Sequence, residues 1–169
     1  RRTLRMLCGQ PGCTVFLDVN LRPPWLRPEL VSEVLGQAHW AKLNAHELDL
    51  LDGGDGSVRG RAERFLERYG LQGLVVTRGA SGAMVLMDTG EFHEAPAAAA
   101  ASVRDTVGAG DAFDSVALLG VGLGWSLETT LRRALLFAAR LCERRGATVP
   151  DRDFYRALRQ DWGLPEPAP

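Results

Sequence analysis

The residues best suited to chemistry lie between Asp105 and Asp111, a run that reads D-T-V-G-A-G-D and leads into an apolar stretch typical of a helix. Glycines on both sides of Ala109 leave backbone N–H groups uncovered at the start of that helix, where the helix dipole is positive. The run therefore predicts an anion site. Asp111 falls in the first turn, where it can accept a proton from a hydroxyl beside it. A base next to an anion cradle suits phosphoryl transfer to an alcohol.

The same seven residues resemble the signature of the ribokinase-like (PfkB) sugar kinase family. The resemblance implies that Asp111 is the catalytic base and that the backbone of Gly108, Ala109 and Gly110 forms the anion hole. It also implies that the two preceding polar residues, Asp105 and Thr106, contact substrate or phosphate. Capping alone would also place glycine and aspartate at a helix start. One departure is Ser115-Val116, where the family usually keeps two very small residues.

A second polar segment, Asp18 to Trp25, follows a short apolar run that predicts a buried strand. It resembles the D-x-N-x-R-P segment of the fructokinase-like branch of the same family, which implies that Asn20 and Arg22 lie near the transferred phosphates. Arginine suits this role because its planar fork binds phosphate oxygens in pairs. A proline-rich turn with solvated side chains is the alternative, and Trp25 is either a sugar platform or a packing residue.

Two further motifs occur in the family's order. Asn44 and Glu47 form N-x-x-E directly after a predicted strand, and the resemblance implies that they organise the Mg²⁺ and phosphate environment; alone, this pattern is a capping box. Thr77, Gly79 and Gly82 form T-x-G-x-x-G, which resembles the family's nucleotide-binding turn, where glycines allow the backbone to approach ATP. A glycine turn in an ordinary hairpin is the alternative.

Elements of two kinds alternate along the chain. Periodicity predicts strands at 14–19, 39–43, 73–77, 83–87 and 91–95, and helices at 28–37, 58–69, 109–120, 127–145 and 151–160, after the last turns of a helix at 1–9. The expected fold is a three-layer α/β/α ribokinase-like fold with a mostly parallel sheet and a peripheral β-hairpin, lacking the N-terminal strands and lid. Residues 1–160 are expected to be the C-terminal part of a PfkB-type sugar kinase domain, and 161–169 a disordered tail.

Composition narrows the partners. The 169 residues carry a net charge of −1, which gives no reason to expect nucleic acid or a membrane surface as a partner. Three cysteines form no C-x-x-C, and no apolar run approaches the roughly 20 residues of a membrane span. We therefore expect a cytoplasmic protein. The first residue is arginine, which suggests that the sequence begins inside a larger protein.

These observations predict ATP-dependent phosphorylation of a sugar hydroxyl by a fructokinase-like carbohydrate kinase. The expected cofactors are ATP and Mg²⁺, with Mg²⁺ held by ATP and organised through Glu47 rather than bound directly by the protein; a monovalent cation and a homodimer of the full-length protein are left open. The fragment alone is expected to be inactive. The alternative is a truncated, non-catalytic kinase half that binds nucleotide weakly or acts as a partner. A Rossmann dehydrogenase is excluded because Phe113 takes the place of the third glycine, and a P-loop is excluded because Lys42, the only lysine, follows an alanine.

Overall fold

The computed structural model describes residues 2–22 and 27–165, so the expectation for Trp25 lies outside the described residues. Its centre is a five-stranded sheet in the order β1-β2-β3-β4-β5. The strands are β1 (Phe16–Asp18), β2 (Trp40–Asn44), β3 (Gly73–Thr77), β4 (Ala83–Met87) and β5 (Phe92–Ala95). The first three run parallel, and β4 and β5 are antiparallel additions at one side. The predicted mostly parallel sheet with a peripheral hairpin is confirmed.

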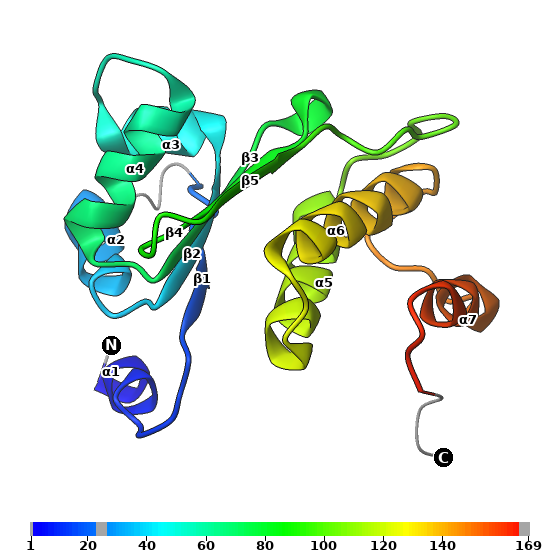
Figure 1. Cartoon of the computed structure of the whole chain (residues 1–169), viewed down its shortest axis with the longest axis horizontal. Helices are drawn as coiled ribbons and strands as arrows, with labels where there is room; N and C mark the ends of the chain where they lie inside the picture. The colour runs from blue at the N-terminus through cyan, green and yellow to red at the C-terminus, as the bar shows by residue number, and fades with distance from the viewer. Residues whose placement is uncertain (1, 23–26, 166–169) are drawn as a thin grey trace.

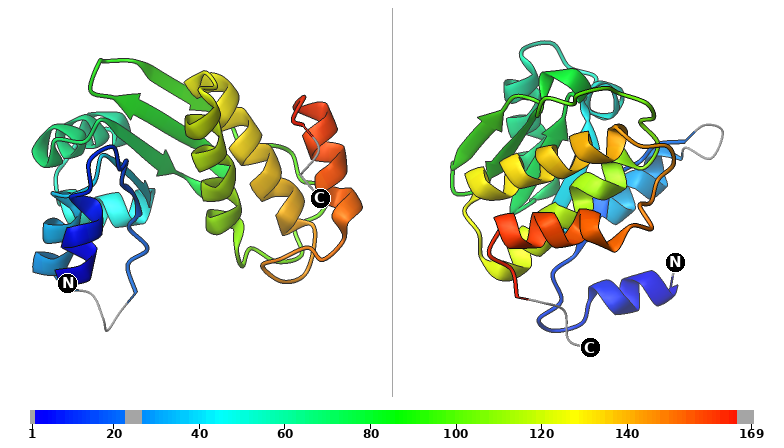
Figure 2. Two further views of the ribbon diagram at one scale, coloured as in Figure 1. Left: turned by 90° about the horizontal axis from the view of Figure 1, so that it is seen from below. Right: turned by 90° about the vertical axis from the view of Figure 1, so that its right-hand side faces the viewer.

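Helices cover both faces of the sheet, as Figures 1 and 2 show. One face carries α2 (Pro28–Leu35), α3 (Ala45–Asp52) and α4 (Val58–Tyr69), with α1 (Arg2–Cys8) below them. The other face carries α5 (Ala109–Leu123) and α6 (Leu127–Cys142), and α7 (Arg152–Asp161) lies outside α6. The layers are those of the ribokinase-like fold predicted above. Within the described residues, no helix combines the length and apolar character that crossing a membrane requires.

The apolar runs of the central strands bury both of their faces. In β3, Leu74 and Val76 pack among the side chains beneath α3 and α4, whereas Val75 packs on the opposite side with Phe113 of α5. Successive side chains of a strand point to opposite faces, so a strand between two helical layers needs apolar residues at every position. This explains why the alternation typical of half-solvated strands is missing from 73–77.

Two helix ends differ from the sequence prediction. α5 continues to Leu123 instead of stopping near Gly120, because Gly120 is buried against α6 and only Gly124, with φ +67°, adopts the left-handed conformation that ends the helix. α6 ends at Cys142, three residues before the expected Arg145. α3 is signalled in the sequence only by its capping box.

The edges of the molecule show two further differences. β1 spans three residues and is half-buried, because it is the outer strand of the sheet. The disordered segment predicted from residue 161 starts too early: Asp161 closes α7, and the ring of Trp162 stacks edge-on against Trp125 with 5.9 Å between centroids. Residues 166–169 lie outside the described residues.

Candidate active site

The carboxyl ends of β1, β2 and β3 meet the N-terminus of α5 around a cavity of about 560 Å³. The strand register aligns these ends, because Asp18 pairs with Lys42 and Asn44 with Thr77. Ligands of open parallel sheets bind at this edge. The cavity brings together most of the sequence-predicted site residues, namely Asn20, Arg22, Asn44, Glu47, Thr77, Gly79, Thr106, Gly108, Gly110 and Asp111. Ala109, Gly82 and Asp105 do not line it.

The start of α5 is built by glycine. Gly108 caps the helix with φ +81° and no side-chain hydrogen bond, and a Cβ at this position would lie 2.7 Å from that of Ala147. A side chain at 108 would therefore be strained and would also collide with the loop after α6. The N–H of Ala109 donates to the carbonyl of Thr106 at 3.2 Å, so of the predicted anion hole only the N–H groups of Gly108 and Gly110 have no backbone acceptor among the described residues. They lie at the positive end of the helix. Asp111 lies in the first turn, exposed to the cavity.

Asp105 holds the loop before α5 in place. Its Oδ1 accepts a hydrogen bond from the N–H of Val107 at 3.0 Å, and its Oδ2 accepts one from the N–H of Gly146 at 3.0 Å. These backbone hydrogen bonds lower the pKa of the Asp105 carboxyl below its usual value. The side chain thus ties the two loops together. It does not line the cavity, and the substrate or phosphate contact expected from the sequence stays a prediction.

Glu47 performs a similar task at the other side of the cavity. The capping box is formed: Asn44 Oδ1 accepts from the N–H of Glu47 at 2.9 Å, and Glu47 Oε2 accepts from the N–H of Asn44 at 2.8 Å. Glu47 Oε1 also accepts from the N–H of Leu21 at 2.8 Å. Both oxygens of this buried carboxylate are therefore engaged, and they fasten the loop that carries Asn20 and Arg22 to the start of α3.

That loop presents its polar side chains to the cavity. Asn20 has φ +35°, uncommon for a residue with a side chain, and its Oδ1 accepts a hydrogen bond from Nε of the exposed Arg22 at 3.1 Å. The other guanidinium donors of Arg22 have no hydrogen-bond partner in the part of the chain that the structure describes, and the side chain lines the cavity, where it can bind an anion.

The two glycines of the Thr77–Gly82 turn have different surroundings. Gly79 has φ +55° and nothing within 4 Å of an added Cβ, and it lines the cavity. Gly82 has φ +90°, and an added Cβ would lie 2.0 Å from the carbonyl oxygen of Ala95. The absence of a side chain at Gly82 thus permits contact with the end of β5, which is a requirement of the fold.

An apolar pocket of about 680 Å³ adjoins the polar cavity. The two spaces share Thr77, Gly79, Thr106 and Gly110. The wall is formed by small and apolar residues from α5, α6 and the β5–α5 loop, among them Ala97–Ala100, Ala109, Phe113, Leu135, Ala138 and Cys142. The alanine run has no distinctive pattern, so its role emerges only when the loop folds over α6.

A buried ion-pair cluster is likewise absent from the sequence-predicted site residues, although two of its members, Asp18 and Lys42, line the cavity. Lys42 Nζ lies 3.1 Å from Asp18 Oδ1 and 3.2 Å from Asp114 Oδ2, and Lys42 is only 6% exposed. Burial lowers the pKa of Lys42, but attraction by Asp114 and Asp18 outweighs it, so the net shift is upward. Burial raises the pKa of Asp114 to about 7 against the attraction of Lys42. The one available signal is a single lysine inside an otherwise apolar strand.

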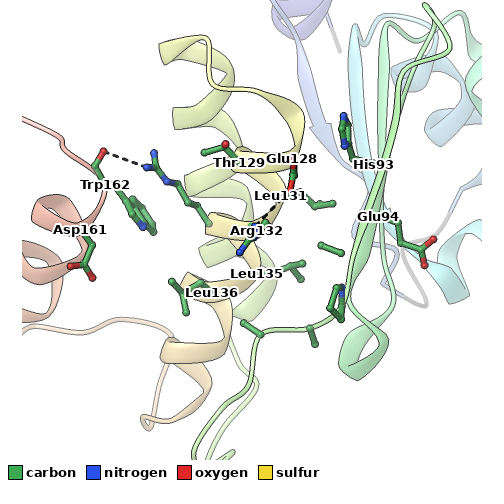
Figure 3. A pocket seen from close by; sticks show the side chains of 15 residues that line it. His93, Glu94, Glu128, Thr129, Leu131, Arg132, Leu135, Leu136, Asp161 and Trp162 are labelled. Carbon is green, nitrogen blue, oxygen red and sulfur yellow. Dashed lines mark hydrogen bonds and ion pairs between the residues drawn. The ribbon is translucent and has the colours of Figure 1, made fainter.

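A further pocket of about 840 Å³ lies between β5, α6 and the end of α7 (Figure 3). It is lined by residues such as His93, Glu128, Arg132 and Trp162. None of the sequence-predicted site residues lines it, so we distinguish it from the candidate active site.

A parallel sheet with polar residues at its carboxyl ends, a glycine-built helix N-terminus and an adjoining apolar pocket define a class: α/β proteins that bind a phosphate-bearing ligand next to an apolar group. The pfkB family carbohydrate kinase model matches residues 3–153, and the chain belongs to this family.

Individual relatives agree with this membership. Aminoimidazole riboside kinase of Salmonella typhimurium is 37% identical over 110 residues, which are 62% of this chain and 33% of that protein. The nucleoside kinase of Burkholderia thailandensis, solved with inosine, has a TM-score of 0.73 and 25% identity over 95% of this chain and 52% of its own. The ribokinase of Cryptococcus neoformans, solved with ADP, has a TM-score of 0.75 and 26% identity over 95% and 55%. The chain thus spans about half the length of these structures and a third of the curated relative.

Proposed function

We propose that this chain carries the ATP and phosphate site of a kinase that phosphorylates a hydroxyl of a sugar or riboside. The observation that supports this most is the continuity of the apolar pocket with the polar cavity through Thr77, Gly79, Thr106 and Gly110. A purine ring fits an apolar pocket of this size, and its phosphates would then point to the N-terminus of α5. The related ribokinase solved with ADP is consistent with this placement.

Different residues of the polar cavity would carry out different parts of phosphoryl transfer. The backbone N–H groups of Gly108 and Gly110 would stabilise charge on the transferred phosphoryl group, and Arg22 would neutralise its oxygens. Asp111, exposed at the same helix start, would take the proton of the acceptor hydroxyl. Asn20 and Thr106 line the space between them.

The described residues do not fit a Mg²⁺ bound directly by the protein. The carboxylates of Asp18, Asp111 and Asp114 approach within 4.8 Å of one another, but Lys42 already provides the positive charge between Asp18 and Asp114. Both oxygens of Glu47 accept backbone hydrogen bonds. We therefore assign Mg²⁺ to the phosphates of ATP and give Glu47 a positioning role toward the Asn20–Arg22 loop.

The relatives support one acceptor class. A riboside kinase, a nucleoside kinase and a ribokinase are among them, which favours a ribose-containing acceptor. The fructokinase-like assignment rests on the Asp18–Arg22 segment alone and stays a prediction, as does a cytoplasmic location.

Nucleotide binding tests the proposal directly. Mg-ATP at 100 times its dissociation constant should stabilise the chain by about 2.7 kcal/mol, measured as a shift in thermal unfolding. Gly110→Val should abolish the shift because the side chain would block the cradle, whereas Gly122→Val, in the same helix but with open space around it, should retain it. A folded chain without any ATP-dependent shift would favour the non-catalytic alternative. The acceptor itself would be identified in a separate assay, by comparing the phosphorylation of ribose, fructose and inosine by a full-length kinase that contains these 169 residues.

A further inference from the structure

Three elements of the fold meet at one buried ammonium group. Lys42 in β2 reaches Asp18 at the end of β1 and Asp114 in the second turn of α5, with N–O distances of 3.1 and 3.2 Å. The exposed fractions of the side chains are 7% for Lys42, 26% for Asp18 and 13% for Asp114. Charges so far from water are costly unless they are paired, so this geometry is strongly constrained.

The cluster adjoins the groups assigned to phosphoryl transfer, and two of its members, Asp18 and Lys42, line the same cavity. A Cβ added at Gly110 would lie 3.1 Å from Lys42 Nζ, so the ammonium lies next to the backbone of the cradle. Asp114 follows Asp111 by three residues and therefore shares its side of the helix. Asp18 precedes Asn20 by two residues. The cluster thus connects both segments that face the transferred phosphoryl group.

The attachment of α5 to the sheet makes this connection important. α5 packs mainly along α6, and α6 contacts β4 and β5. Within residues 2–22 and 27–165, the Lys42–Asp114 hydrogen bond is the polar contact that links α5 to the strands. Apolar packing resists separation but tolerates sliding, whereas a charge-assisted hydrogen bond fixes direction.

We propose that Lys42, Asp18 and Asp114 form a positioning network that fixes the first turns of α5 against the ends of β1 and β2, and so aims Asp111 at the acceptor hydroxyl. This inference rests on the proposed function, since it assigns Asp111 as the base. Lys42 is a positioning residue in this scheme. It acts through Asp114 and Asp18, and its side chain also lines the cavity, so the KM for ATP must be measured beside kcat to separate positioning from ligand contact.

Asp114 makes the network sensitive to pH. Its Oδ1 is buried and has no hydrogen-bond partner among the described residues, and burial raises the pKa of the carboxyl to about 7. The charged groups that face it are Lys42 from β2 and Asp18 from β1, with Asp111 one turn earlier in α5. Below about pH 7, Asp114 takes up a proton and the ion pair with Lys42 becomes a weaker hydrogen bond.

The network can be tested without any catalytic assay. Carboxyl ¹³C NMR of the 169-residue chain should show Asp114 titrating with a midpoint near 7. Lys42→Met should raise this midpoint, because the attraction that favours the ionised carboxylate is removed. Asp114 titrating near its ordinary value, or not responding to Lys42→Met, would overturn the network irrespective of kinase activity.

The positioning role is tested by steady-state kinetics in a full-length kinase that contains these 169 residues. Lys42→Met should lower kcat by about 10–100-fold, because a small misplacement of the base is costly, while the KM for ATP should change less than about threefold. Asp114→Asn should remove an inflection near pH 7 from the profile of kcat. Glu63→Gln, which removes a half-exposed ion pair with Arg59 in α4, is the matched control and should leave both parameters unchanged.

The outcomes separate the two proposals. Wild-type kcat in Lys42→Met, or an unchanged inflection in Asp114→Asn, would refute the positioning role. If Lys42→Met does not fold, the double variant Lys42→Met/Asp114→Asn is used in its place, because it removes one positive and one negative charge and so keeps the net charge of the cluster. Wild-type kcat in the double variant would equally refute the positioning role. If the wild-type kinase has no activity while Asp114 titrates as described, the proposed function fails and the buried network remains.

Discussion

At the scale of single residues, two of the predicted site carboxylates hold neighbouring backbone segments in place by accepting hydrogen bonds from backbone N–H groups. Glu47 and Asp105 both belong to motifs that resemble family signatures, yet each uses its two oxygens to accept backbone N–H groups from loops that border the cavity. Asp111 is different, because it is exposed at the helix start and no other described side chain holds it there by a hydrogen bond. This contrast supports the proposal that Asp111 is the base.

Replacing that carboxylate tests its role. Asp111→Asn keeps the size and shape of the side chain but cannot accept the hydroxyl proton, so it should reduce kcat by roughly 10²–10⁴-fold. ATP affinity should stay close to that of the wild type, because the cradle is backbone. Steady-state kinetics together with an ATP titration measures both quantities. Unchanged turnover would remove Asp111 from the mechanism, and loss of the fold would make it a helix cap.

Gly82 and Gly90 have nearly the same φ but different surroundings, so alanine substitutions at the two positions separate the cost of backbone strain from the cost of steric crowding. Gly82→Ala should lower the free energy of unfolding by at least about 3 kcal/mol, since φ is +90° and the new Cβ would lie 2.0 Å from the carbonyl oxygen of Ala95. Gly90→Ala in the β4–β5 turn, with φ +86° and open space, should lower it by only about 1–2 kcal/mol. Urea unfolding measures both. Equal losses would show that the contact with Ala95 is unimportant.

At the scale of elements, α5 contributes both to the proposed active site and to the packing of the helical layer against α6. Its N-terminus forms the proposed cradle, and its C-terminal part lies against α6, where a Cβ at Gly120 would be 2.5 Å from Thr130 Oγ1. The predicted helix end at Gly120 is wrong, because this glycine is needed for close approach of the two helices and the helix continues through Gly122.

The two helical glycines should respond in opposite directions. Gly120→Ala should lower the free energy of unfolding by about 1–2 kcal/mol, because crowding against Thr130 outweighs the gain in helix propensity. Gly122→Ala has nothing within 4 Å and should raise it by about 0.5–1 kcal/mol. Thermal or urea unfolding of the pair checks the sign. Stabilisation by both substitutions would mean that α5 and α6 pack less tightly than the structure shows.

For the whole molecule, α5 carries several exposed apolar side chains near its C-terminal end. Four large side chains near the C-terminal end of α5 are 38–51% exposed, namely Leu118, Leu119, Val121 and Leu123. β1 forms the outer edge of the sheet. Exposed apolar side chains and an open strand edge favour association. The chain spans about half the length of its solved relatives.

We expect the 169 residues alone to phosphorylate sugars poorly and to self-associate. Positioning of the acceptor supplies much of the rate in phosphoryl transfer, and the chain covers only half of the related kinases. Sugar phosphorylation should be near background, and sedimentation velocity should show association that Leu119→Gln/Leu123→Gln reduces. Robust kinase activity of the chain alone would mean that these residues already contain a complete acceptor site.

The sequence alone determined the strands, most helices and the location of the site. Apolar runs such as 73–77 and capping residues such as Ser126 act locally, and parallel strands bring their carboxyl ends to one edge whatever the rest of the chain does. The motifs that carry Asn20, Asn44, Thr77 and Asp111 follow strands or open a helix, which is enough to predict that they share a site. The structure places all four around one cavity.

Only the tertiary structure decided which of these residues face the cavity and what supports them. Lys42 and Asp114 are 72 positions apart, and the alanines at 97–100 become a pocket wall only when their loop lies over α6. Such contacts depend on the register of strands and the packing of helices, which no local pattern encodes. The same reason explains Gly82: its neighbour is the backbone of Ala95, and that proximity exists only once β4 and β5 have paired.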